Sequence, residues 1–363
     1  MEVGARHILR DGPGFDGALA ALPRNRDTAP VRRFLTFARP FTLLPPLLGI
    51  ISGAICAWGS AHNPDPTRTL TLTVILTVVL GSLCASFLNA ASNAINQIYD
   101  LEIDRINKPD RPLCTGAISI REAWIFTWVM YAMAIIPTWL VVVHPYATWS
   151  EKAAAPLAAH ECFFIYLAGM IFTFIYSAPA MGRTKRHTLL ANLTIAIPRG
   201  GLLKVAGWTM VAHALSTRAP YVASSEPWFI GSIFMLFLLG AASTKDFSDM
   251  KGDLAGGCRT LPIRYGVRRA AWMIAPFFIF PWLLLPVGAF LGDPLSPGNS
   301  ILTGNRNFLA SLGFVLAAWG AYTVWLIVRN PDELTSTENH PSWRQMYLMM
   351  MAAQVGFAIA YLV

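Results

Sequence analysis

The sequence predicts an all-α membrane protein with about nine transmembrane helices. Of the 363 residues, 55% are hydrophobic and only 13% are charged. Soluble domains carry about 25% charged residues, so a soluble protein of this length would lack the polar side chains needed to cover its surface. Apolar segments long enough to cross a bilayer also recur along the whole chain.

Nine segments qualify as membrane helices, because spanning the ~30 Å hydrocarbon core takes about 20 apolar residues. They are residues 42–58, 71–98, 123–143, 161–179, 188–213, 227–244, 271–292, 307–328 and 345–363. The fifth is the least regular, since it contains Arg199 and Lys204. Charged side chains inside a membrane are costly and indicate a functional site. Pro198, Gly200 and Gly201 predict a broken or kinked helix there, so these charges either reach a polar cavity or snorkel.

The basic residues orient the chain. With a cytoplasmic N-terminus, 22 Lys and Arg fall on the cytoplasmic side and 4 on the other, as the positive-inside rule requires. This asymmetry accounts for the pI near 9.4 without nucleic acid, for which no motif is present. Residues 1–34 lack the apolar core of a signal peptide and are expected to form a mobile cytoplasmic tail, although their Arg content also fits a transit peptide. Residues 35–363 form the membrane domain.

The first acidic motif follows the second predicted helix and consists of Asn96, Asp100 and Asp104. The spacing i, i+4, i+8 places the three side chains on one helix face. Asn93 extends this polar stripe into the membrane helix. Glu102 lies off the face, and we expect it to be solvated.

The second acidic motif lies at the end of the sixth predicted helix and consists of Asp246, Asp249 and Asp253. Their spacing again gives one face, and like charges stacked on a helix repel each other, so a cation is expected between them. Mg²⁺ prefers one or two carboxylates together with substrate phosphate. Two opposing motifs could therefore hold two ions and clamp a diphosphate. The alternative is that these are ordinary solvated loop charges.

Basic residues that could complete a diphosphate site lie on the same side of the predicted membrane. Lys and Arg neutralise the charge that develops on a departing phosphate group. Any one of these residues could equally serve only to orient the chain in the membrane. As catalytic residues we favour Lys185 and Lys245. The full set is Lys108, Arg111, Lys185, Arg186 and Lys245.

With these motifs the sequence resembles the UbiA superfamily of intramembrane prenyltransferases. The resemblance begins near Arg39 and continues to the last helix. It is carried by the two acidic motifs, by Asn107-Lys108-Pro109 after the first, by Lys245 before the second, and by Tyr176-Ser177-Ala178-Pro179 leading into Arg183-Thr184-Lys185-Arg186. It implies nine helices around a central cavity with a cytoplasmic cap, and an active site on the cytoplasmic side.

The resemblance also implies roles for residues. The first acidic motif would bind one Mg²⁺, and the second would bind another or orient the acceptor. Tyr176 and Lys185 would contact the diphosphate and help it leave, and Arg39 would lie near the acceptor pocket. Arg199, as an intramembrane charge, is expected separately to bind the acceptor or line the cavity. Aromatic rings can stabilise a carbocation-like centre, and the candidates are Phe87, Phe172, Phe174 and Tyr176.

The expected reaction is Mg²⁺-dependent transfer of an isoprenoid chain from a prenyl diphosphate to a small acceptor, with the lipid tail lying among the helices. The run 96–104 most resembles homogentisate-type enzymes, which favours an aromatic acceptor of the homogentisate or hydroxybenzoate type. The run 105–112 also resembles enzymes that alkylate geranylgeranylglyceryl phosphate, a lipid phosphate, and chlorophyll synthases share the layout. An ion-coupled transporter is the alternative of a different class, but transporter sites lie near the membrane midplane.

Overall fold

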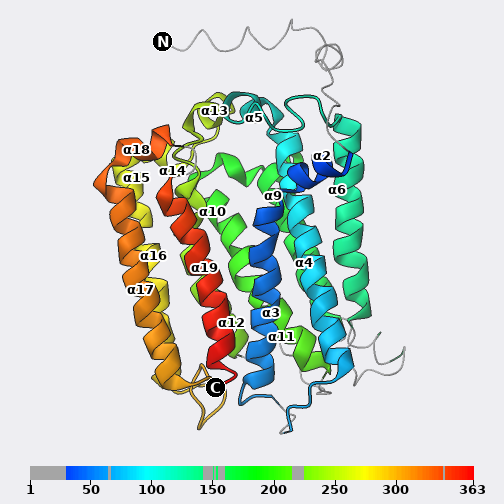
Figure 1. Ribbon diagram of the computed structural model, residues 1–363, viewed down its shortest axis with the longest axis vertical. Coiled ribbons are helices and arrows are strands. Elements are labelled where there is room, and N and C mark those ends of the chain that lie inside the picture. The colour runs from blue at the N-terminus through cyan, green and yellow to red at the C-terminus, as the bar shows by residue number, and fades with distance from the viewer. Residues whose placement is uncertain are drawn as a thin grey trace, which may run out of the picture.

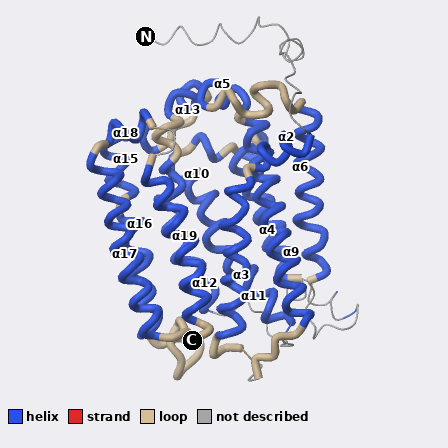
Figure 2. Tube along the Cα trace, viewed as in Figure 1, coloured by secondary structure: helices blue, strands red, loops and turns tan. Residues whose placement is uncertain are grey.

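The computed structural model describes residues 30–63, 67–141, 150, 153, 160–214, 225–337 and 340–363. These residues form a bundle of roughly parallel and antiparallel helices with loops at its two ends (Figures 1 and 2). Residues 1–29 of the predicted tail lie outside the described residues, and helix α2 begins at Pro30. The helices that build the bundle are α3 (Leu44–Gly59), α4 (Leu72–Tyr99), α6 (Ile120–Ile135), α9 (Glu161–Ser177), α10 (Thr188–Ala196), α11 (Leu203–Ala214), α12 (Ser225–Ala241), α16 (Pro276–Phe290), α17 (Arg306–Arg329) and α19 (Pro341–Ala360).

Seven helical stretches are long and apolar enough to cross a membrane, which makes this a multi-pass membrane protein. They coincide with seven of the nine predicted segments and are Pro40–Gly59, Leu72–Tyr99, Ile120–Leu140, Thr188–Val211, Ser225–Thr244, Val267–Phe290 and Arg306–Arg329. The other two predicted segments correspond to α9, which is apolar but has 17 residues, and to α19, which has 20 residues but includes Arg344, Gln345 and Gln354.

Short helices gather at one end of the bundle, which we call the capped end. Figure 1 shows α5, α13, α15 and α18 there, while α19 runs to the C-terminus at the opposite end. The helix α3 packs against α4, α11 and α19, and α16 packs against α17. Helices from the two ends of the sequence therefore pack side by side in the bundle. The short helices are α2 (Pro30–Ala38), α5 (Leu101–Asn107), α13 (Met250–Ala255), α14 (Leu261–Tyr265), α15 (Val267–Ile274) and α18 (Pro331–Ser336).

The fifth predicted helix contains the irregularity expected from its Pro and Gly residues. Between α10 and α11 the backbone forms a π-helical turn over Ile197–Leu202, a feature that often marks functional sites. Gly200 packs against the backbone of Met235, and Gly231 packs against the backbone of Gly201. A Cβ at Gly200 or Gly231 would collide with the facing backbone, so the glycines allow this turn to lie tightly against α12.

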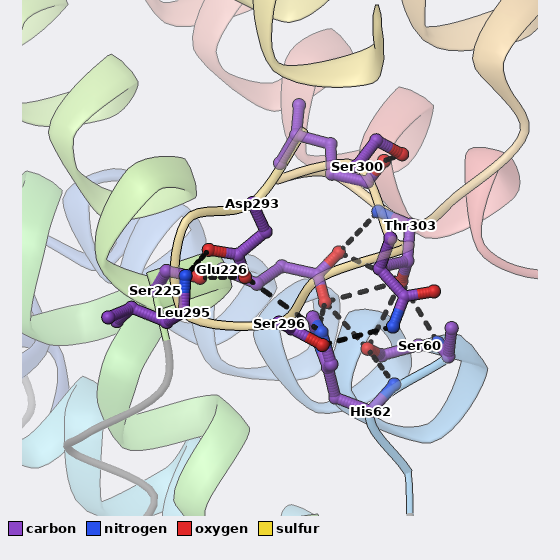
Figure 3. Close-up of polar contacts among 12 residues, drawn as sticks. Ser60, His62, Ser225, Glu226, Asp293, Leu295, Ser296, Ser300 and Thr303 are labelled. Atoms are coloured by element: carbon purple, nitrogen blue, oxygen red, sulfur yellow. Dashed lines mark hydrogen bonds and ion pairs between the residues drawn. The ribbon is translucent and has the colours of Figure 1, made fainter. Parts of the chain in front are cut away.

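A buried carboxylate joins four segments at the end opposite the capped end. Glu226, at the start of α12, is fully buried. Figure 3 shows the Glu226 carboxylate as the acceptor for donors from Ser60, His62 and Thr303, and the Tyr361 hydroxyl donates to it as well. A buried charge is tolerated only when it is hydrogen-bonded in this way. We call Ser60, His62, Glu226, Thr303 and Tyr361 the Glu226 cluster.

The Glu226 cluster is expected to make stability depend on pH through His62. The hydrogen bond from His62 Nδ1 to Glu226 raises the pKa of His62 above its usual 6.5, with Asp293 adding to the effect. A raised folded-state pKa means that this contribution to stability is present below pH 6.5 and is lost as the pH rises through the folded-state value. The thermal unfolding temperature of the wild type relative to His62→Gln should therefore be higher at pH 6 than at pH 8.5. An equal difference at both pH values would contradict this assignment.

Candidate active site

A cavity of about 300 Å³ opens inside the bundle beneath the capped end. It is lined by residues of α4, α5, α9, the π-helical turn, α13 and α19, so segments far apart in the sequence meet around it. All six residues of the two acidic motifs line it: Asn96, Asp100, Asp104, Asp246, Asp249 and Asp253.

The first acidic motif keeps its predicted face although the helix changes at its centre. Helix α4 ends at Tyr99, Asp100 caps it, and α5 begins at Leu101. The backbone hydrogen bonds continue across this junction, from Asp100 N to Asn96 O at 2.8 Å and from Asp104 N to Asp100 O at 2.7 Å. The i, i+4, i+8 relation therefore survives, and the Glu102 side chain, which is 70% exposed, confirms the expectation that it is solvated.

The second acidic motif does not lie on one continuous helix, so that part of the prediction was wrong. Helix α12 ends at Ala241 and is followed by a 3₁₀ turn to Thr244, and α13 begins only at Met250. Asp249 caps α13, and Asp253 lies one turn into it. The interruption folds the segment over the bundle, and this turn, rather than helical periodicity alone, aims its carboxylates into the cavity.

Asn107 joins the two motifs directly. Its side-chain nitrogen donates to the Asp249 carbonyl at 2.8 Å, and its side-chain oxygen accepts from the Gly252 backbone N–H at 2.8 Å. A Cβ at Gly252 would collide with the Asn107 side chain, so glycine is required for this approach. Lys108 forms an ion pair with Asp249. We call these contacts between α5 and α13 the Asn107 clasp. The sequence motif Asn107-Lys108-Pro109 carries part of the family resemblance, but its spacing does not predict the clasp.

Basic side chains pair with the acidic motifs. Asp100 is 1% exposed and accepts from Arg183 at 2.9 Å and from Lys185. Lys185 also lies 3.5 Å from Asp253, so it connects the two motifs. Arg111 pairs with Asp104. Arg183 is a residue that the sequence prediction missed, and its place in the basic run 183–186 was the available signal.

The electrostatics of these carboxylates reflect burial and crowding. Burial lowers the pKa of Lys185, but Asp100, Tyr176 and Asp253 together outweigh burial and raise that pKa. Burial raises the pKa of Asp253 to about 6, against the opposing effect of Lys185. Burial and the neighbouring Asp253 and Asp249 carboxylates raise the pKa of Asp246 well above its usual value. Such crowded carboxylates favour a site that receives added positive charge.

The donor set fits Mg²⁺ without forming a complete metal cage. Among the described residues, no group of three His, Cys, Asp or Glu side chains is arranged to hold a metal ion. Carboxylate and amide oxygens are nevertheless the ligands that Mg²⁺ prefers, and this ion commonly uses one or two carboxylates and completes its shell with water and phosphate. The two facing motifs therefore match a metal that binds together with a phosphorylated ligand.

Most other predicted site residues also line the cavity. Tyr176 on α9 lies there with Lys185, and Lys245 lies over the Trp343 ring at 4.5 Å. Asn93 lines the wall, but its amide donates to Ala38 O at 3.0 Å and to Thr42 Oγ1 at 2.8 Å, so it fixes the segment before α3. Arg186 is not among the lining residues.

Two arginines enter the cavity away from the ion pairs described above. Arg39 adopts a left-handed backbone conformation with φ 59° at the break before α3, which is strained for a residue with a Cβ. Burial and the nearby Arg111 lower the pKa of Arg39. Arg199 reaches the cavity from the π-helical turn. Among the described residues, neither guanidinium forms an ion pair with an acidic side chain.

Lys204 lies outside the cavity lining and is 1% exposed. It donates to the side-chain oxygen of Gln354, which does line the cavity. Its ammonium group lies 4.6 Å from the centre of the Phe234 ring. This intramembrane charge is therefore satisfied by an amide and an aromatic face, and it orients Gln354 toward the cavity.

Comparison with protein families gives one match over most of the chain: the UbiA prenyltransferase family matches residues 43–348. A digeranylgeranylglyceryl phosphate synthase of Thermococcus kodakarensis is 30% identical over 92% of this chain and 99% of its own length. A probable homogentisate phytyltransferase 2 of Oryza sativa subsp. japonica is 30% identical over 78% of this chain and 68% of its own length.

The bundle is also similar to solved structures. A UbiA homolog from Archaeoglobus fulgidus bound to GPP and Mg²⁺ superimposes with a TM-score of 0.60, at 20% identity, over 91% of this chain and 99% of that chain. A digeranylgeranylglyceryl phosphate synthase structure gives a TM-score of 0.58 at 20% identity. These likenesses establish the fold.

Proposed function

The chain belongs to the UbiA prenyltransferase family, and from this premise we propose that it transfers an isoprenoid chain from a prenyl diphosphate to a small acceptor, with Mg²⁺ bound by its two acidic motifs. One observation carries the proposal: both motifs, Tyr176 and Lys185 line the same cavity. The Archaeoglobus fulgidus homolog bound to GPP and Mg²⁺ supports the same ligands here. Because the chain belongs to a prenyltransferase family, we no longer consider the alternative of an ion-coupled transporter.

The capped end of the cavity is the proposed diphosphate site. Asn96, Asp100 and Asp104 would hold one Mg²⁺, and the three aspartates of the second acidic motif would hold the other. Bound there, the metal would supply charge stabilisation for the diphosphate oxygens. The basic residues that now pair with the aspartates lie within reach of the same phosphate groups and can exchange partners: Lys108, Arg111, Arg183 and Lys185.

The proposed chemistry is alkylation of the acceptor by the allylic carbon of the donor. The C–O bond to the diphosphate breaks, a bond to an acceptor carbon or oxygen forms, and the acceptor loses a proton. Lys185 stabilises the departing diphosphate. Of the aromatic candidates, Phe172 and Tyr176 line the cavity, whereas Phe174 stacks on Tyr131 at 5.5 Å and Phe87 packs in the bundle core. Phe172 and Tyr176 are thus the rings placed to stabilise positive charge on the isoprenoid.

The acceptor is proposed to be aromatic and anionic, of the homogentisate or hydroxybenzoate type. Arg39 and Arg199 provide positive charge for a carboxylate, and the Trp343 and Tyr347 rings at the same cavity fit an aromatic partner. The Thermococcus kodakarensis relative, whose whole length is matched, favours a second candidate, the lipid phosphate geranylgeranylglyceryl phosphate. Its phosphate would bind to the same two arginines, Arg39 and Arg199.

The proposed topology has nine membrane crossings with the capped end in the cytoplasm. Helices α9 and α19 would add two crossings to the seven apolar spans. The distribution of 22 basic residues against 4 favours this orientation. An odd number of crossings agrees with α2 lying at the capped end while the C-terminus lies at the other (Figure 1).

The test is transfer of radiolabelled geranylgeranyl diphosphate in membranes, with Mg²⁺ or with EDTA, to homogentisate, 4-hydroxybenzoate and geranylgeranylglyceryl phosphate. We expect product with one aromatic acceptor in Mg²⁺, and at least a hundredfold less in EDTA, on the order of the loss caused by removing one transition-state stabiliser. Product only with the lipid phosphate would select the second candidate. Undiminished transfer in EDTA would contradict the proposed role of the acidic motifs.

A further inference from the structure

A second pocket lies at the capped end, outside the cavity that holds the acidic motifs. Its volume is about 340 Å³. Two loops form it, one between α9 and α10 and the other between α13 and α14. Its lining residues are Pro179, Gly182, Arg183, Arg186, His187, Gly257 and Arg259. We propose that this pocket binds a phosphate group, which we assign to the headgroup of an anionic lipid.

Backbone contacts hold the two loops of the pocket together. Arg259 N donates to Arg186 O at 3.1 Å, and residues 187 and 259 form a parallel bridge. The Thr188 hydroxyl donates to the Arg259 carbonyl. The backbones of Arg186 and Arg259 are consequently held at adjacent places on the rim, although 73 positions separate them in the sequence.

The pocket is basic, and two of its three arginines have no ion pair within the described residues. Among the described residues that line it, none is acidic. Arg186 and Arg259 have no side-chain hydrogen bond or ion pair within the described part of the chain. Arg183 pairs with Asp100 through one terminal nitrogen, while its Nε is buried without a partner. Guanidinium groups match phosphate oxygens in pairs of parallel hydrogen bonds, so the pocket presents unused donors suited to phosphate.

The surroundings of the pocket indicate a lipid rather than a soluble phosphate. The first turn of α10, which follows His187 directly, exposes Leu189 at 62% and Leu190 at 49%. These residues begin the apolar span Thr188–Val211, so the hydrocarbon boundary runs just below the pocket. A phospholipid could place its phosphate on the arginines and its chains along these leucines. Basic pockets at the cytoplasmic end of membrane helices are suited to anionic headgroups.

The site would be coupled to the active site through Arg183. Its guanidinium contacts Asp100, a residue of the first acidic motif, and lines the phosphate pocket as well. Arg183 also has a positive φ of 40°, so its backbone is held in an uncommon conformation. A bound phosphate would therefore help to keep Arg183 in place beside Asp100.

The experiment measures lipid binding to the purified full-length protein in detergent, with EDTA present to suppress metal-dependent diphosphate binding in the main cavity. Phosphatidylglycerol, phosphatidylcholine and inorganic diphosphate are titrated separately. The variant Arg186→Gln/Arg259→Gln is compared with Arg268→Gln/Arg269→Gln, which removes two exposed arginines from α15. We expect phosphatidylglycerol to bind about tenfold more weakly or worse to the first variant and within about twofold of wild type to the control.

The remaining outcomes are equally decisive. If diphosphate binds in a way that depends on Arg186 and Arg259 but phosphatidylglycerol does not bind, the pocket is a phosphate site. Its ligand would then be a free phosphate, and the assignment to a lipid would be wrong. Equal weakening in both double variants would reduce the effect to general surface charge and overturn the proposal. If the double variant does not fold, Arg186→Gln alone and Arg259→Lys are compared, and unchanged phosphatidylglycerol affinity in Arg186→Gln would also overturn it.

Discussion

Replacing Asp100 by Asn is expected to lower turnover at least about a hundredfold while the protein still inserts and folds. Asp100 is almost fully buried and, within the described part of the chain, is the one residue of the first acidic motif paired with two cations, Arg183 and Lys185. Asparagine keeps the shape of the side chain but not its negative charge, so the proposed metal would lose a charged ligand. The measurement is kcat in membranes at saturating Mg²⁺ and prenyl diphosphate.

The matched controls come from the same region. Asp249→Asn, on the facing segment, should show a loss of similar size because Asp249 belongs to the other proposed metal set. Glu102→Gln removes a carboxylate two residues from Asp100 that is solvent-exposed, and it should stay within about twofold of wild type, as surface substitutions usually do. Near-normal turnover in either aspartate variant would remove the two-metal hypothesis. A complete loss in Glu102→Gln would mean that the other helix face carries the site.

Glu226→Ala should have the largest effect on stability, lowering the free energy of unfolding by about 3 kcal/mol or more. The substitution leaves the buried hydroxyls of Ser60 and Tyr361 and the half-buried donor of Thr303 without their acceptor, and each unsatisfied buried group costs about 1–3 kcal/mol. The measurement is the unfolding transition of the protein in detergent, followed by denaturant or heat. Turnover of the folded fraction at low temperature should be retained, because Glu226 does not line the cavity.

The control for this prediction separates charge from hydrogen bonding. Glu226→Gln keeps one acceptor oxygen and nearly the same volume, so it should destabilise less than Glu226→Ala. Glu102→Ala, which removes an exposed carboxylate, should change stability by less than about 0.5 kcal/mol. A Glu226→Ala protein as stable as the wild type would show that the Glu226 cluster contributes nothing net to folding.

Local spacing predicted the parts of the site that depend on one helix. Asn96, Asp100 and Asp104 follow the i, i+4, i+8 pattern, and the structure brings all three to the cavity. The π-helical turn at Arg199 agrees with the irregularity predicted from Pro198 and its neighbouring glycines, because proline removes a helical hydrogen bond. Hydropathy alone located the seven apolar spans.

The features that spacing could not predict depend on partners that are distant in sequence. Asn107 meets Asp249 across 142 positions, and Glu226 meets Tyr361 across 135. No periodicity within one segment encodes such a pairing, since it is fixed by how the whole bundle closes. The break between α12 and α13 was missed for a related reason. The spacing of the second acidic motif fits a helix. The hydrogen bonds with Asn107 instead hold this segment in a conformation that interrupts the helix between α12 and α13.

Ion pairs give Asp100, Asp104, Asp249 and Asp253 a cationic partner in the cavity, and this has a thermodynamic consequence for the order in which ligands bind. A metal ion arriving alone competes with the lysines and arginines for the same carboxylates, and a diphosphate arriving alone competes with the carboxylates for the same cations. If both were bound, these carboxylates could hold the metal and the cations could bind the phosphates, so each group released from an ion pair would gain a new counter-charge. We therefore expect positive heterotropic cooperativity between the two ligands of the proposed reaction, in which each ligand raises the affinity for the other by the same factor.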